Sequence, residues 1–192
     1  MNERTFKEKS KHHHLFLLLF FDTFELTNYL GGMKVSAKIN EIAPDFELVA
    51  SDGSKVKLSD FKGKKHVVLY FYPKDMTPGC TTQACDFRDH YDDFSALDAV
   101  ILGVSPDPLE RHEKFTEKHG LPFLLLVDED HEVAEKYGVW KLKKNFGREY
   151  MGIERSTFII NKEGKIVKEW RKVRVKNHVK EALAFVKEMN DQ

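Results

Sequence analysis

One run of seven residues limits what this chain can fold into, because it lacks polar alternation. The run is His66-Val67-Val68-Leu69-Tyr70-Phe71-Tyr72. A strand with one face in water alternates apolar and polar side chains, whereas a continuous run of β-branched and aromatic residues predicts a strand covered on both faces. Pro73 follows and ends the strand, since proline has no N–H to donate to a sheet. We therefore expect a central strand with other layers packed on both of its faces.

From Met33 onward, strands and helices alternate, and we expect one domain over residues 33–192. The predicted strands are a hairpin with arms 46–49 and 56–58, then 99–105, 123–127, 156–160 and a hairpin partner at 165–170. The predicted helices are 77–97, a helix that follows 106–108 and runs to His119, 132–137, and a last helix that carries Val179, Leu183 and Val186. Strands separated by helices of this length predict an α/β domain, with helices on both faces of a central sheet and a hairpin at its start.

The residue totals exclude several classes of protein. Lys plus Arg and Asp plus Glu number 31 each among 192 residues, so no net charge attracts nucleic acid or anionic lipid. We therefore expect no nucleic-acid partner and no membrane partner. We also expect a cytoplasmic location. Two cysteines are too few for a disulfide-stapled secreted scaffold, so the pair has to be interpreted from its local setting.

Residues 1–32 differ from the rest, and we expect them to be disordered or to lie outside a native protein that starts at Met33. The apolar run 15–21 is far shorter than the roughly 20 residues that span a bilayer. A basic start followed by a short apolar run also resembles an export signal, but no Ala-x-Ala-like cleavage site follows. The three histidines His12-His13-His14 are able to bind metal, although such residues in a polar tail more often bind nothing.

A helix is predicted to start just past the central strand. In Thr77-Pro78-Gly79-Cys80, threonine takes the N-cap, proline the first helical position and Cys80 the third. The spacing of Cys80, Ala84 and Phe87 places the cysteine on the inward face of that helix. Unpaired backbone N–H groups and the positive end of the helix dipole favour a thiolate there, which makes Cys80 a candidate nucleophile. On position alone, a small buried apolar cysteine is an equally good interpretation.

Cys85 gives the first cysteine a partner, but only after a conformational change. Residues five apart in a helix rise about 7.5 Å and turn about 140°, which puts their α-carbons beyond the roughly 7 Å limit for a disulfide. If Cys80 is oxidised to a sulfenic acid, unwinding of one or two turns would let Cys85 attack it and release water. Pro78-Gly79 and Thr81-Thr82 have modest helix propensity, so we expect this unwinding to cost relatively little.

Two other uses of a cysteine pair compete with this one. A tetrahedral zinc site requires four ligands. The sequence has no second cysteine pair, so His66 and His90 are the candidate partners for the two cysteines. A dithiol for general disulfide exchange would have two residues between its cysteines, whereas this pair has four. The spacing weakens the exchange interpretation without removing it.

Three separated segments resemble one family. The segment Pro73-Lys74-Asp75-Met76-Thr77-Pro78-Gly79-Cys80 is similar to the Pro-x-x-x-Thr-x-x-Cys signature of peroxiredoxins, and Cys85 resembles the resolving cysteine of the PrxQ, or bacterioferritin comigratory protein, group. The resemblance begins at 39–46 and includes 152–158, which resembles the segment that bears the active-site arginine. It implies a thioredoxin-like fold with a mixed central sheet, and reduction of hydrogen peroxide or organic hydroperoxides without a cofactor or metal.

The resemblance also implies a role for each matched residue. Cys80 would be the peroxidatic nucleophile, and Cys85 would resolve it within the same chain. Thr77 would hydrogen-bond the thiolate and the peroxide, Arg155 would supply positive charge, and Pro73 would shield the site from water. The group further implies thioredoxin or a similar dithiol as reductant, and a monomer.

Two hypotheses about function are thus open: a thiol peroxidase, and a non-enzymatic zinc-binding or interaction module on a thioredoxin-like scaffold. Two other features have simple structural interpretations. Trp140 lines the entrance to the site or, more simply, packs in the interior. The basic run Arg171, Lys172, Arg174 and Lys176 is expected to be the solvated rim of a strand and turn.

Overall fold

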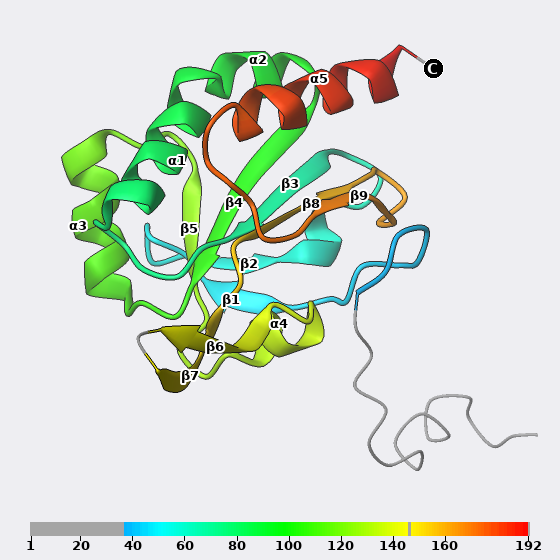
Figure 1. Ribbon diagram of the computed structural model, residues 1–192. Coiled ribbons are helices and arrows are strands. Elements are labelled where there is room, and N and C mark those ends of the chain that lie inside the picture. Colours follow the sequence, from blue (N-terminus) through cyan, green and yellow to red (C-terminus); the bar gives the residue numbers. More distant parts are fainter. Residues whose placement is uncertain (1–36, 146, 192) are drawn as a thin grey trace, which may run out of the picture. The chain divides into compact units, whose positions relative to one another are not determined.

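A five-stranded mixed sheet forms the centre of the computed structural model, which describes residues 37–145 and 147–191 (Figure 1). Its strand order is β5 (Leu124–Val127), β4 (Ala99–Ser105), β3 (His66–Phe71), β8 (Ser156–Ile160) and β9 (Ile166–Trp170). β3, β4 and β5 run parallel, whereas β8 and β9 pair antiparallel to their neighbours. The predicted central strand and mixed sheet are confirmed. The expectations for residues 1–32 lie outside the described residues.

Helices and a hairpin cover opposite faces of this sheet (Figure 1). On one face lie α1 (Pro78–Asp89), α2 (Tyr91–Ala96), α3 (Leu109–His119) and α5 (His178–Asn190). On the other lie the hairpin β1 (Glu47–Val49) and β2 (Lys55–Lys57), the 3-10 turn η1 (Leu58–Phe61) and α4 (Glu132–Lys136). Along β3, Val68 and Tyr70 pack against the α1 side while Leu69 and Phe71 pack against the α4 side, so the strand is buried on both faces. No helix among the described residues is long and apolar enough to cross a bilayer.

The single helix predicted over 77–97 is wrong, because the structure divides it at His90. The Nδ1 atom of His90 lies 2.9 Å from the carbonyl oxygen of Asp86, the group that the backbone N–H of His90 would bind in a continuous helix. That N–H instead donates to the carbonyl of Arg88, and α1 ends. The buried stripe nevertheless continues across the break, since Phe87 and Phe94 are both buried.

A second hairpin, β6 (Trp140–Asn145) with β7 (Arg148–Ile153), was not predicted. Its residues are mostly charged or exposed, so they lack the apolar alternation that signals a strand. Trp140 at its base packs against the core and lies 3.8 Å from His131 between ring centroids. This contact supports the interpretation of Trp140 as a packing residue.

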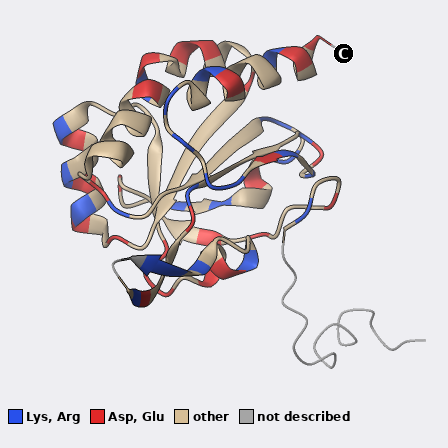
Figure 2. Ribbon diagram, in the orientation of Figure 1, with Lys and Arg blue, Asp and Glu red and all other residues tan. Residues whose placement is uncertain are grey.

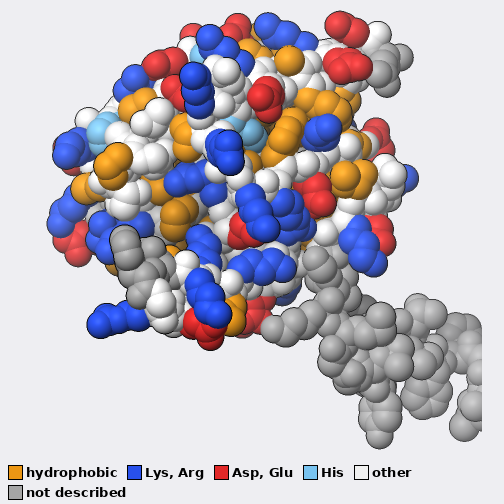
Figure 3. All heavy atoms as spheres, viewed as in Figure 1, with side chains coloured by type: hydrophobic (Ala, Val, Ile, Leu, Met, Phe, Trp, Pro, Cys, Tyr) orange, Lys and Arg blue, Asp and Glu red, His pale blue; other side chains and the backbone are white. Residues whose placement is uncertain are grey.

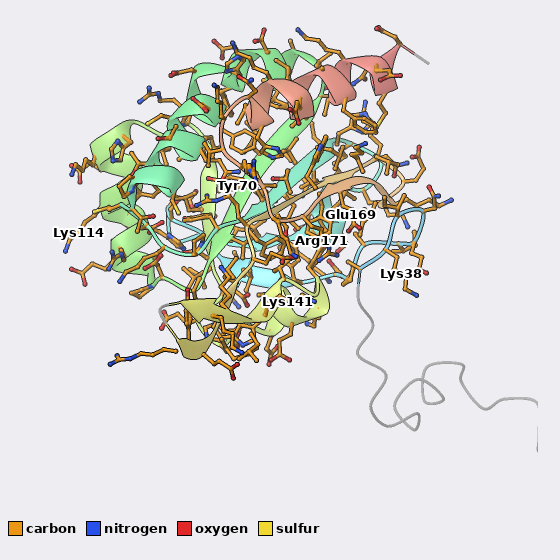
Figure 4. The ribbon with its side chains drawn as sticks, in the orientation of Figure 1. Lys38, Tyr70, Lys114, Lys141, Glu169 and Arg171 are labelled. Atoms are coloured by element: carbon orange, nitrogen blue, oxygen red, sulfur yellow. The ribbon has the colours of Figure 1, made fainter. Side chains whose placement is uncertain are left out.

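The basic run after β9 is only partly a solvated rim. Lys172, Arg174 and Lys176 are exposed, as expected. Arg171 is instead half-buried: its guanidinium donates to the carbonyls of Tyr137 and Gly138 at 3.1 Å and pairs with Glu169 at 2.9 Å. Figure 4 labels Glu169 and Arg171, near the end of β9. A charged side chain that is adjacent to a strand can thus satisfy backbone groups of a neighbouring helix end, which the charge pattern alone does not reveal.

Candidate active site

Cys80 lies beyond the carboxyl end of the central strand, at the third position of α1. Thr77 has the extended backbone of an N-cap residue, and Pro78 is the first helical residue, as predicted. The cysteine side chain is 2% exposed and packs in the cluster between the sheet and α1. The N–H groups of a first helical turn have no partner within the helix, so this end of α1 favours an anion beside it.

Arg155 is held next to Cys80 by the sheet register. It belongs to the two-residue connection between β7 and β8, and the pairing of Phe71 with Ser156 places that connection at the end of β3. Its Nη2 lies 3.1 Å from the sulfur of Cys80. The structure therefore brings together two predicted site residues that are 75 positions apart in sequence. A guanidinium at this distance from a sulfur stabilises negative charge on it.

Gln83 is a site residue that the sequence did not reveal. It is fully buried, one turn after Cys80, and its Oε1 accepts a hydrogen bond of 2.5 Å from Nη1 of Arg155. The only sequence signal is its place three residues after the cysteine, on the same helical face. Its effect is to fix the guanidinium so that Nη2 points at Cys80.

Thr77 does not make the bond that its role by resemblance requires. Its hydroxyl donates to the carbonyl of Lys74 at 3.0 Å, and its side chain makes no capping bond to α1. With its hydrogen committed to Lys74, the hydroxyl oxygen is left to accept, not to donate. In this geometry the hydroxyl oxygen of Thr77 is able to accept a hydrogen bond from a thiol or a hydroperoxide, whereas its hydrogen is not available to a thiolate. Pro73 is half-buried and lies two residues after the end of β3, in the same loop as Thr77.

Cys85 is a free thiol near the other end of α1. Its sulfur is half-buried and lies 4.0 Å from Nδ1 of His119, at the end of α3. α1 is continuous from Pro78 to Asp89, so Cys80 and Cys85 sit in one intact helix and are not bonded. Any disulfide between them requires the first turns of α1 to unwind, as the spacing predicts.

A second cation approaches the segment that bears Arg155. Lys143, from β6, donates to the carbonyl of Ile153, and burial lowers the pKa of its ammonium. Figure 2 colours Lys and Arg positions blue along β6 and the connection from β9 to α5, and Figure 3 shows Lys and Arg side chains on this face. The sequence did not single out Lys143, because the hairpin that directs it was not predicted.

The histidines considered as zinc ligands are not gathered at the cysteines. His66 begins β3, at the end of the strand opposite to Cys80, and the ring of His90 is bonded to a carbonyl of α1. Within residues 37–145 and 147–191, no three His, Cys, Asp or Glu side chains are grouped as a metal site requires.

A buried histidine next to the site predicts acid sensitivity. Burial lowers the pKa of His178 to about 4, and the charge of Arg155 adds to the effect. Between pH 6.5 and 4 the unfolded chain therefore binds a proton that the folded protein does not, and stability falls as the pH falls. We expect the free energy of unfolding to be about 2 kcal/mol lower at pH 5 than at pH 7 from this group. Urea unfolding of the wild type and His178→Gln checks this, since parallel pH profiles of the two proteins would contradict it.

Known proteins resemble this chain over most of its length. The AhpC/TSA family model matches residues 39–169. Peroxiredoxin Bcp of Bacillus subtilis (strain 168) is 65% identical over 158 residues, which cover 82% of this chain and 100% of that protein. Peroxiredoxin Bcp of Escherichia coli (strain K12) is 45% identical over 151 residues, 79% of this chain and 96% of that protein. A structure of the Xanthomonas campestris bacterioferritin comigratory protein, studied for alkyl peroxide reduction, aligns with a TM-score of 0.72 and 40% identity over 76% of this chain and 92% of that chain.

Proposed function

This chain belongs to the AhpC/TSA family, as a peroxiredoxin of the Bcp or PrxQ group, and from that premise we propose how its cysteines turn over peroxide. It is a thiol peroxidase on a thioredoxin-like fold. The alternative of a non-enzymatic zinc-binding or interaction module is not favoured by these relatives. The observation that carries the proposal is the 3.1 Å contact of Arg155 with the buried sulfur of Cys80 at the start of a helix.

In the first step the Cys80 thiolate attacks one oxygen of the peroxide. The S–O bond forms, the O–O bond breaks, and the second oxygen leaves as an alcohol, or as water from hydrogen peroxide, once it has taken up a proton. Arg155 donates toward the charge that moves from sulfur to the departing oxygen. Thr77, whose hydroxyl oxygen is free to accept, takes a hydrogen bond from the hydroperoxide and orients it. Pro73 keeps water from the thiolate.

In the second step Cys85 attacks the sulfur of the Cys80 sulfenic acid. The S–S bond forms, the S–O bond breaks and water leaves. The first turns of α1 unwind to allow it. The side chain of Thr82 supports this idea, because its hydroxyl donates to the carbonyl of Pro78 at 3.0 Å, a bond that weakens helices slightly.

A dithiol then reduces the disulfide, and we propose a thioredoxin-type protein as its source. The active unit is a monomer of the domain 33–192, and its location is the cytoplasm. Organic hydroperoxides are proposed as substrates beside hydrogen peroxide, which fits the alkyl peroxide reduction named for the Xanthomonas campestris relative.

The Cys85→Ser variant tests this scheme. We expect it to consume about one equivalent of peroxide at the wild-type rate and then to stop cycling with thioredoxin, because its Cys80 sulfenic acid has no resolving thiol. Peptide mapping of the wild type after one equivalent of peroxide should show a Cys80–Cys85 crosslink. Sustained thioredoxin-driven cycling by the variant, or no crosslink in the wild type, would contradict the scheme.

A further inference from the structure

Residues 73–77, within the loop between β3 and α1, have a conformation that needs external support. Met76 has a φ of +60°, in the left-handed region that a non-glycine residue rarely adopts. The side chain of Met76 is 37% exposed, so its own packing supplies little of that support. Strained residues of this kind persist where the surroundings hold them, and they cluster at functional sites. The loop leads straight into Thr77 and the helix start that surrounds Cys80.

Asp75 supplies the support from inside the protein. It is fully buried, and each of its polar groups has a partner. Its Oδ1 accepts a 2.6 Å hydrogen bond from the hydroxyl of Tyr72, and its Oδ2 lies 2.7 Å from Nδ1 of His112. Its backbone N–H donates to Asp107 at 2.7 Å, and its carbonyl accepts from Arg111 at 3.2 Å. Burial with complete hydrogen bonding makes this aspartate a fixed point of the loop.

The proton count at His112 shows that the Asp75–His112 pair shares one hydrogen. His112 is fully buried, and its Nε2 lies 3.2 Å from the carbonyl oxygen of Leu126. A carbonyl only accepts, so Nε2 carries a hydrogen. One more proton then lies between Nδ1 and Oδ2, whichever atom it is closer to. The pair has no net charge in either case, which makes its burial tolerable.

α3 holds the loop through two consecutive residues. Arg111, next to His112, pairs with Asp107 at 3.0 Å, and Asp107 in turn accepts from the hydroxyl of Ser105 at 2.9 Å. The loop is thus bonded to α3 and to the end of β4, elements that do not contain either cysteine.

We propose that Asp75 and His112 are positioning residues of the peroxidase reaction. They hold loop 73–77 in its strained form, and the loop in turn fixes Thr77 and the N-terminus of α1 around Cys80. This inference rests on the function proposed above. It concerns the peroxide step, because the resolving step proceeds after the first turns of α1 have unwound from the loop.

The test compares variants of Asp75 in the Cys85→Ser background, where peroxide consumption in a single turnover reports oxidation of Cys80 alone. Asp75→Ala leaves Tyr72 and His112 without their acceptor, and we expect oxidation to slow about tenfold. Asp75→Asn should restore most of the rate, because its amide oxygen accepts from Tyr72 while its NH2 donates to Nδ1 of a neutral His112. An asparagine variant as slow as the alanine variant would overturn the proposal.

A matched control separates positioning from stability. Asp128 is also buried, and its carboxylate accepts from the N–H groups of Val133 and Ala134 at the start of α4, on the other face of the sheet. Asp128→Ala should destabilise the protein and leave the oxidation rate within about twofold of wild type. If it slows oxidation as much as Asp75→Ala does, the effect follows stability and the positioning role is refuted.

Two further comparisons complete the test. His112→Leu should slow oxidation by a similar factor of about ten, and it replaces Asp75→Ala if that variant does not fold. A wild-type rate in either folded variant would overturn the positioning role alone. A wild-type chain whose Cys80 is not oxidised by peroxide would instead refute the proposed function, and the positioning role with it.

Discussion

The Cys80→Ser variant is expected to lose peroxide turnover by at least about a thousandfold while it keeps the wild-type fold. Serine has nearly the shape of cysteine, so the buried site between α1 and the sheet stays filled. Its hydroxyl does not ionise near neutral pH, and its oxygen cannot be oxidised as a thiolate sulfur can. The measurement is steady-state consumption of hydrogen peroxide and of a bulky hydroperoxide with thioredoxin as donor. Turnover equal to that of the wild type would end the assignment of Cys80 as nucleophile.

The control for this experiment is the other cysteine. Cys85→Ser makes the same chemical change five residues later in the same helix. Loss of the first oxidation in Cys80→Ser but not in Cys85→Ser would assign the two steps to the two thiols. Loss of it in both variants would point to damage to α1 instead.

The Arg155→Met variant is expected to slow oxidation of Cys80 about a hundredfold, in the range found when one donor to a developing charge is removed. Methionine fills much of the volume of arginine but donates no hydrogen bond, so Cys80 and Gln83 both lose their partner. Arg155→Lys should fall in between, because one ammonium does not reproduce the two-pronged contact with Sγ and Oε1. Single-turnover kinetics measures the rate. A rate within threefold of wild type for Arg155→Met would exclude a catalytic role.

Arg171→Met is the matched control for Arg155. Arg171 is another half-buried arginine with several partners, but those partners are the carbonyls of Tyr137 and Gly138 and the carboxylate of Glu169. Its loss should lower the unfolding free energy by about 1–3 kcal/mol, since the partly buried carbonyls of Tyr137 and Gly138 lose a charged donor. It should not slow the oxidation of Cys80. An equal slowing in both variants would mean that the effect of Arg155 is structural.

The fold could be predicted where one residue pattern determined one element. The uninterrupted run 66–72 fixed the middle of the sheet, because only a strand between two layers tolerates it. The break at His90 could not be predicted, since it depends on a ring nitrogen that takes the place of a backbone N–H. The β6–β7 hairpin was missed for the opposite reason: it is exposed, so no burial pattern marks its strands.

The site could be predicted only where a local sequence motif or a family resemblance marks a residue. The helix start marked Cys80, and the family resemblance marked Arg155. The bond of the Thr77 hydroxyl to Lys74 and the support of Asp75 by His112 could not be predicted, because they depend on how side chains are oriented after the helices pack. His112 lies 37 residues from Asp75, and no periodicity connects the two.

In the proposed cycle, the weak start of α1 limits the lifetime of the oxidised Cys80. Pro78, Gly79 and Thr82 make the first turns of α1 easy to open, and in that scheme the speed of opening decides how long Cys80 remains a sulfenic acid. A sulfenic acid that is not resolved in time reacts with a second peroxide and becomes a sulfinic acid, which thioredoxin does not reduce. A helix start that was more stable would therefore make the protein less durable: at high peroxide it would inactivate itself sooner. In this scheme the same first turns of α1 that hold Cys80 in place also protect it from a second oxidation, because they open quickly.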